Sequence, residues 1–320
     1  MLWGLNTGQV CLTTLAYAAA GQTFQTFTGF HHGPVSCVKL VPNQLGFALT
    51  GGVDGVIKLW DVSRARCIRE FRTGLSLVGN ATTKITHICC EPGSRIVAGT
   101  SAGEIYVWEV DISSLITPLT APSSGVSSPA RTVSTENFQA PDPALLSEML
   151  PVPKLPKVIE LPEEFKGVAF LDVDFGMGHS GLILAQASDA QVMHLYSLET
   201  LELLATLKSP AHFSPITAVH WDIPKYEKPM ISLSNQGTKS SGTHVLSRQD
   251  GMSSLLATGD QNGNICLWYM TDILKRAKTA FHPSHTSKDE RTLEPTCVLK
   301  GHDTKVTSLF VDKLLIISGR

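Results

Sequence analysis

The stretch ALTGGVDGVIKLWD at residues 48–61 decides the fold, because related stretches recur twice along the chain. They are VAGTSAGEIYVWE at 97–109 and LATGDQNGNICLWYM at 256–270. Each has an apolar run, a turn that contains glycine, and a second apolar run that contains tryptophan. Asp-Gly and Asn-Gly pairs favour two-residue hairpin turns, which need positive φ angles. The pattern therefore predicts a repeated antiparallel hairpin.

A shorter motif precedes each hairpin. It places apolar residues first and fourth and a Ser or Thr second, as expected for the start of a buried strand. The segments that share it are VSCVKL from Val35, ITHICC from Ile85, ITAVHW from Ile216 and VTSLFV from Val306, with VAFLDV from Val168 as a looser fit. Three histidines, His31, His212 and His302, each lie four residues before the motif that follows them.

These units resemble WD repeats, which run about 40 to 45 residues from a Gly-His to a Trp-Asp and form one four-stranded propeller blade. The resemblance implies a hydrogen-bonded network within each blade. Its predicted members are His31, Thr50, Asp54 and Trp60 in one unit, His212, Thr258, Asn262 and Trp268 in another, and Trp108 and His302 elsewhere. Asn262 would replace the usual Asp. The second repeat departs from the pattern at Ala81, Ala98 and Ala102, and the third repeat keeps only Asp189 and Tyr196.

The resemblance predicts an all-β fold, a β-propeller of four-stranded antiparallel blades. About four blades are complete, at 35–72, 85–161, 168–208 and 216–300, with partial blades at both termini. We therefore expect residues 1–320 to form one WD-repeat domain that is incomplete as a ring. We favour a fragment of a larger propeller; in the alternative, the two termini combine into one blade and close a five-bladed ring.

Three polar insertions interrupt the repeats, at about 111–157, 223–252 and 271–292. They are rich in Ser, Pro, Thr or charged residues, and we expect them to be disordered because they carry too little apolar surface to order alone. The start of the third insertion, TDILKR, has a pattern compatible with a helix.

Composition narrows the function classes. Hydrophobic residues make up 42% and charged residues 17% of the 320, with a formal net charge of −2. This balance predicts neither nucleic-acid binding nor a membrane span. The seven cysteines form no C-x-x-C pair, and Cys37, Cys89, Cys90 and Cys266 lie in apolar runs. They are typical of core residues in a reducing compartment, so we expect an intracellular protein of the cytoplasm, the nucleus or both.

No catalytic or cofactor motif is visible, so we expect no enzyme activity, no cofactor, no metal and no small-molecule substrate. His282 and His285 lack further ligands. The basic cluster Lys275, Arg276 and Lys278 is offset by nearby acids, so a solvated loop explains it.

WD-repeat propellers mostly bind protein partners on the face that carries the loops before the first strand and the central hairpin turns. The resemblance thus implies a non-catalytic scaffold for protein–protein interaction. The candidate partner-binding positions are Ser36, Val53, Lys84, Thr86, Ser101, Thr217, Gln261, Lys305 and Thr307. The alternative is a substrate-recognition subunit of a cullin-type ubiquitin ligase of the F-box and WD-repeat class, which needs an F-box module before Met1.

Overall fold

The computed structural model describes residues 1–13, 23–42, 44, 46–74, 83–91, 95–110, 155–161, 167–175, 181–223, 254–280, 292–312 and 315–320. These residues form short strands and one helix, and they divide into two compact units, Met1–Ile159 and Glu160–Arg320. The predicted all-β fold is confirmed for the described residues.

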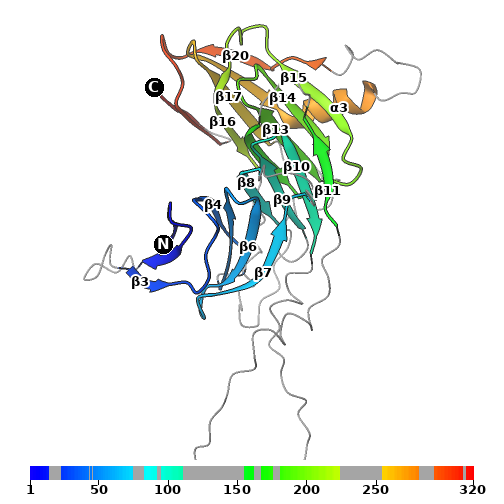
Figure 1. The fold of residues 1–320 in the computed structure, drawn as a ribbon. Coiled ribbons are helices and arrows are strands. Elements are labelled where there is room, and N and C mark those ends of the chain that lie inside the picture. The colour runs from blue at the N-terminus through cyan, green and yellow to red at the C-terminus, as the bar shows by residue number, and fades with distance from the viewer. Residues whose placement is uncertain are drawn as a thin grey trace, which may run out of the picture. The chain divides into compact units, whose positions relative to one another are not determined.

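The first unit holds three sheets, each built from strands that are consecutive in the chain (Figure 1). The first sheet contains β1 (Leu2–Gly4), β2 (Val10–Thr13) and β3 (Thr23–Thr26). The second, here the β4 sheet, contains β4 (Val35–Leu40), β5 (Phe47–Gly52), β6 (Val56–Asp61) and β7 (Arg66–Arg72). The third, the β8 sheet, contains β8 (Ile85–Cys90), β9 (Arg95–Thr100), β10 (Glu104–Glu109) and β11 (Lys157–Glu160).

The second unit also holds three sheets. The β12 sheet contains β12 (Val168–Asp174), β13 (Leu182–Ala187), β14 (Val192–Ser197), β15 (Leu203–Lys208) and β19 (Thr292–Leu293). The β16 sheet contains β16 (Ile216–Asp222), β17 (Leu255–Asp260), β18 (Asn264–Tyr269) and β20 (Cys297–Lys300). The last sheet pairs β21 (Ser308–Val311) with β22 (Ile316–Gly319). The short sheets at the two termini match the predicted partial blades.

One irregularity repeats in all four larger sheets. The first strand of each shifts register after its first residue, so that one residue bulges out of the pairing with the second strand. The bulged residues are Ser36, Thr86, Ala169 and Thr217. Because the looser segment VAFLDV carries the same bulge, it is a full member of the repeat.

Neighbouring sheets pack on each other through the apolar residues of their strands. In the first unit, Leu49 and Ile57 of the β4 sheet share a buried cluster with Ile96 of the β8 sheet. In the second unit, Leu184 of the β12 sheet lies in one cluster with Trp268 of the β16 sheet. Strands β6, β13 and β17 are buried at every position, so side chains on both faces of these strands are packed.

The prediction that the third insertion is disordered is wrong for its two ends, whereas the helix that TDILKR indicated is present. Helix α3 (Met270–Ala280) starts one residue after β18 ends and covers the predicted TDILKR segment. Its residues Ile273 and Ala277 are buried in the same cluster as Leu207 of β15. Beyond it, β19 pairs in parallel with β15, with Leu293 opposite Leu207. The insertion is therefore ordered at both ends because its few apolar residues cover the outer strand of the preceding sheet.

Candidate functional site

A buried chain of hydrogen bonds ties the loop before β4 to strands β5 and β6. Trp60 Nε1 donates to Thr50 Oγ1 at 2.7 Å, and Thr50 Oγ1 lies 2.7 Å from His31 Nε2. His31 Nδ1 lies 3.1 Å from Asp54 Oδ1 and 3.2 Å from Oδ2. Because an ionised carboxylate can only accept, Nδ1 carries the proton, and in the neutral imidazole Nε2 accepts from the Thr50 hydroxyl. These four side chains thus form one continuous chain of hydrogen bonds.

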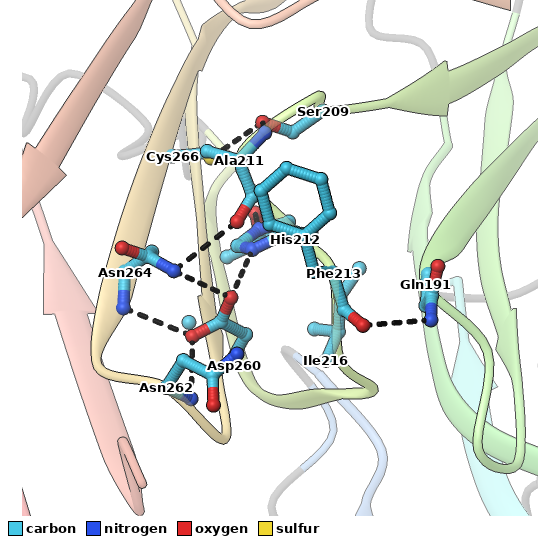
Figure 2. Close-up of polar contacts among 12 residues, drawn as sticks. Gln191, Ser209, Ala211, His212, Phe213, Ile216, Asp260, Asn262, Asn264 and Cys266 are labelled. Atoms are coloured by element: carbon cyan, nitrogen blue, oxygen red, sulfur yellow. Dashed lines mark hydrogen bonds and ion pairs between the residues drawn. The ribbon is translucent and has the colours of Figure 1, made fainter. Parts of the chain in front are cut away.

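An equivalent network lies in the β16 sheet (Figure 2). Trp268 Nε1 donates to Thr258 Oγ1 at 3.1 Å, and Thr258 Oγ1 lies 2.9 Å from His212 Nε2. His212 Nδ1 lies 3.0 Å from Asp260 Oδ2, and both of these side chains are fully buried. The network is complete, but its carboxylate comes from a residue that the sequence pattern did not indicate.

The prediction that Asn262 holds the acidic position of this network is wrong. Asp260, the last residue of β17, pairs with His212, and the backbone N–H of Asn262 donates to Asp260 Oδ1 at 2.9 Å. Asn264 donates twice to the same carboxylate, from its backbone N–H at 2.9 Å and from Nδ2 at 3.0 Å. Asp260 therefore holds both the histidine and the hairpin turn.

Gly52 explains why the two carboxylates come from different positions. It occupies in β5 the place that Asp260 occupies in β17, and a Cβ atom built on Gly52 would collide with Asp54 Oδ1 and with His31 Nδ1. The space that a side chain would fill at Gly52 is thus taken by the Asp54 carboxylate, which reaches back from the turn. In the β16 sheet, Asp260 fills that space directly.

The networks lower the pKa of both carboxyl groups. Burial alone would raise the pKa of Asp54, but hydrogen bonds from His31 and from the backbone N–H of His32 and Val56 outweigh it and lower the pKa to about 2. Burial likewise opposes ionisation of Asp260, and hydrogen bonds from Asn264 and His212 lower its pKa. Both groups are therefore ionised acceptors at neutral pH.

The remaining predicted members form partial networks. His302 Nε2 lies 2.7 Å from Ser318 Oγ, and Ser318 takes in β22 the place of Thr50 in β5. Trp108 is buried, but Ala98 stands where β5 and β17 have threonine, and the ring of Trp108 packs on Phe71 and Tyr106. Ala81 lies outside the described residues.

The third repeat, which forms the β12 sheet, keeps little of the network. Tyr196 occupies the place of the tryptophan and is buried, which raises the pKa of its phenol to about 12. Asp189 is exposed and has a φ angle of 60°, so it serves the turn between β13 and β14. Such a residue fits this turn because Asp tolerates the left-handed region better than most residues.

The networks and nearby hydrogen bonds hold two sets of loops at one end of the sheets. The backbone N–H of Val53 donates to Pro34 O at 3.1 Å, which joins a hairpin turn to the loop before β4. Asn264 Nδ2 donates to Ala211 O at 3.1 Å and makes the equivalent connection in the β16 sheet. Together these loops and turns form the loop face of each unit.

The candidate partner-binding residues lie on or beside this face, with unequal exposure. Lys84, Ser101, Gln261, Lys305 and Thr307 are exposed, whereas Ser36, Val53, Thr86 and Thr217 are half-buried.

Two of the half-buried residues have their hydroxyls engaged by backbone carbonyls. Ser36 Oγ donates toward Ile85 O at 2.5 Å and Thr217 Oγ1 toward Val306 O at 2.6 Å; Ile85 begins β8, and Val306 lies just before β21. Gln186, which the sequence did not single out, makes a third such contact, from Nε2 to Ile216 O at 3.0 Å. These three side chains therefore connect neighbouring sheets.

One exposed aromatic residue on the loop face was also missed by the sequence pattern. Phe213 follows the buried His212 and is 80% exposed, and Gln191 Nε2 donates to its backbone carbonyl at 3.1 Å (Figure 2). Only the structure reveals it, because no rule of the repeat specifies the residue after the histidine.

The described residues offer little reactive chemistry. All seven cysteines are free thiols, and burial raises the pKa of Cys37, Cys90 and Cys266 to about 11. Within the described ranges, no group of three or more His, Cys, Asp and Glu side chains is placed to hold a metal ion. His282 and His285 lie outside those ranges. In the part of the chain that the structure describes, no helix is long and apolar enough to cross a membrane.

Four successive antiparallel sheets share one bulge and one hairpin, and two of them contain the same buried network, which is the pattern of β-propeller blades. Residues 21–61 match the family model described as WD domain, G-beta repeat. The match supports the resemblance to WD repeats that the sequence pattern indicated.

Two curated proteins are similar to part of the chain. The Periodic tryptophan protein 2 homolog of Dictyostelium discoideum is 35% identical over 94 residues, which cover 28% of this chain and 9% of the relative. Ribosome biogenesis protein YTM1 of Phaeosphaeria nodorum is 34% identical over 89 residues, which cover 28% of this chain and 17% of the relative. The chain thus matches only a small part of either relative.

Proposed function

We propose that this protein is a non-catalytic scaffold that docks protein partners on the loop face of its blades. Fold alone does not assign a function, so the proposal rests on how the loops are held. The supporting observation is that His31 and His212, which lie in loops, are anchored in fully hydrogen-bonded networks beneath the face. Loops that are already ordered lose little conformational entropy when a partner binds, which favours recognition.

The charges on the loop face favour protein partners over nucleic acid. Lys84 and Lys305 are exposed cations, but Asp189 and Asp303 are exposed on equivalent loops. A nucleic-acid interface would need a basic excess to neutralise phosphates, and the chain carries a net charge of −2.

The test is quantitative affinity purification of the intact protein from cells, with two charge-reversal pairs. The loop-face pair is Lys84→Glu with Lys305→Glu, one exposed residue in each unit. The control pair is Arg66→Glu with Lys275→Glu, which are exposed on strand β7 and on helix α3. We expect partners to be lost from the loop-face pair and kept by the control pair. Equal recovery from both, or loss from the control pair alone, would overturn loop-face docking.

A second measurement identifies the cellular assembly in which the scaffold acts, called its setting below. The name of the YTM1 relative favours an assembly that acts in ribosome biogenesis, and hence a place inside the cell that includes the nucleus. The ubiquitin-ligase alternative gains no support from the family match or from the two relatives. Cosedimentation of the protein with large ribonucleoprotein particles in a sucrose gradient would support the first setting. Recovery of cullin subunits in place of such particles would support the second.

A further inference from the structure

We infer that the loop face of the second unit binds an extended peptide segment of a protein partner, with Phe213 as the anchor. This inference rests on the proposed scaffold function and names the kind of partner and the residues that select it. Four residues, Gln191, Phe213, Gln261 and Asn262, are called the Phe213 platform below.

The side chain of Phe213 is largely exposed to solvent, although it directly follows a buried residue. Its neighbour His212 is 3% exposed, whereas Phe213 is 80% exposed. A buried phenylalanine side chain stabilises a fold through the apolar area it removes from water, and Phe213 contributes little of this stabilisation. Exposed aromatic residues of this kind commonly act as anchors in protein interfaces.

The backbone of Phe213 is held from several directions. Gln191 Nε2 donates to the Phe213 carbonyl at 3.1 Å, and Asn264 Nδ2 donates to the carbonyl of Ala211 two residues earlier at 3.1 Å. His212 between them is fixed by the buried network (Figure 2). The ring is therefore presented on an ordered loop, which lowers the entropy cost of binding.

The loops around Phe213 are contiguous. The turn 260–264 contacts the loop 209–215 through Asn264 and Ala211, and it contacts the next loop through His302, whose N–H donates to Gly263 O at 3.3 Å. Gln191 brings the turn between β13 and β14 to the same place. Phe213 thus lies among the loops that carry the exposed amides Gln191, Gln261 and Asn262.

The chemistry of these side chains fits a peptide. A side-chain amide both donates and accepts, so it matches the alternating N–H and C=O groups of an extended backbone. Asp189, Asp303 and Lys305 are exposed on the surrounding loops, and the exposed Lys208 and Lys300 end the strands that lead into two of them. The four platform residues themselves carry no charge, which selects a segment of low net charge with one large apolar side chain against Phe213.

The test is a selection of short random peptides displayed on phage against the immobilised full-length protein. Selected peptides are then synthesised and titrated against the wild type and variants in solution. We expect a shared aromatic or large aliphatic residue in the selected peptides. Phe213→Ala should weaken binding by about tenfold or more, which corresponds to about 1.4 kcal/mol. Phe213→Tyr should retain it, and Gln261→Ala should weaken it severalfold.

A matched control exists in the first unit. Phe30 is 56% exposed and precedes His31, and its ring contacts His32. Phe30→Ala should leave peptide binding unchanged. Binding should also change little with salt, since the platform carries no charge. Hydrogen exchange of the loop 209–215 in Phe213→Ala should match that of the wild type, which excludes a folding defect.

Several results would overturn the inference. They are the recovery of no peptide above background, binding that is indifferent to Phe213→Ala, or tight, salt-sensitive binding of a single-stranded RNA that requires Phe213. If these occur while the Lys84 and Lys305 variants still lose partners, loop-face docking stands and only the role of Phe213 fails. If both experiments fail, the proposed function fails as well.

Discussion

The β4 and β16 sheets contain the same buried hydrogen-bonded network, but its carboxylate comes from a different position in each sheet. Both join a buried tryptophan, threonine and histidine to a carboxylate. In the β4 sheet the carboxylate comes from Asp54 in the turn, and in the β16 sheet it comes from Asp260 at the end of the strand. The network therefore requires a carboxylate at one position in space, and either of two positions in the sequence can supply it.

The tryptophans should show the largest effect, and a similar one in both sheets. Trp60 and Trp268 are both almost completely buried and both donate to a threonine. We expect Trp60→Ala and Trp268→Ala each to lower the free energy of unfolding of their unit by about 3–5 kcal/mol, measured by urea denaturation. A loss below about 1 kcal/mol at either site would mean that the two sheets are not equivalent.

Removal of the carboxylate should distinguish the sheets. Asp260 accepts hydrogen bonds from His212, from the backbone of Asn262 and from two groups of Asn264, and its side chain is fully buried. Asp54 has a side chain that is 7% exposed, and it accepts from His31 and two backbone groups. We expect a cost of about 3 kcal/mol for Asp260→Ala and about 2 kcal/mol for Asp54→Ala. The reverse order, measured by the same denaturation, would contradict the hydrogen-bond assignment.

Moving the carboxylate tests the comparison directly. Gly52→Asp alone should destabilise the first unit, because the new side chain collides with Asp54 and His31. In the Asp54→Ala background the same change should restore about 1 kcal/mol, since the carboxylate then arrives from the position that Asp260 uses. A double variant that is less stable than Asp54→Ala alone would show that the two positions are not interchangeable.

Lowering the pH should reduce the stability that the network of the β4 sheet contributes. The pKa of Asp54 is lowered to about 2 in the folded protein, against about 3.9 in an unfolded chain. A lowered carboxyl pKa contributes stability that is complete above the unfolded value and is lost as pH falls through the folded value. We expect stability to fall between about pH 4 and pH 2, and to fall less steeply in Asp54→Ala. Identical pH profiles for the two proteins would contradict the ionised pair.

Much of the fold could be predicted from the sequence because the repeat is periodic. The strand motifs and the tryptophan positions place four of the blades, and the histidine spacing identifies His31, His212 and His302 as network members. The assignment of Asn262 failed because alignment by the turn glycine matches it to Asp54, while the space at Gly52 is visible only in three dimensions. Phe213 and Gln186 were missed because their roles depend on contacts with other loops and sheets.

The most direct test of the account is hydrogen exchange of the intact protein, followed by mass spectrometry. The central claim is that buried networks hold the loops of a binding face in order. The account predicts slow exchange in the loop 209–215 of the wild type. In Asp260→Ala, exchange should become faster there and stay unchanged in the loop 28–34 of the first unit. Fast exchange of both loops in the wild type, or an equal response of both loops to Asp260→Ala, would contradict the claim.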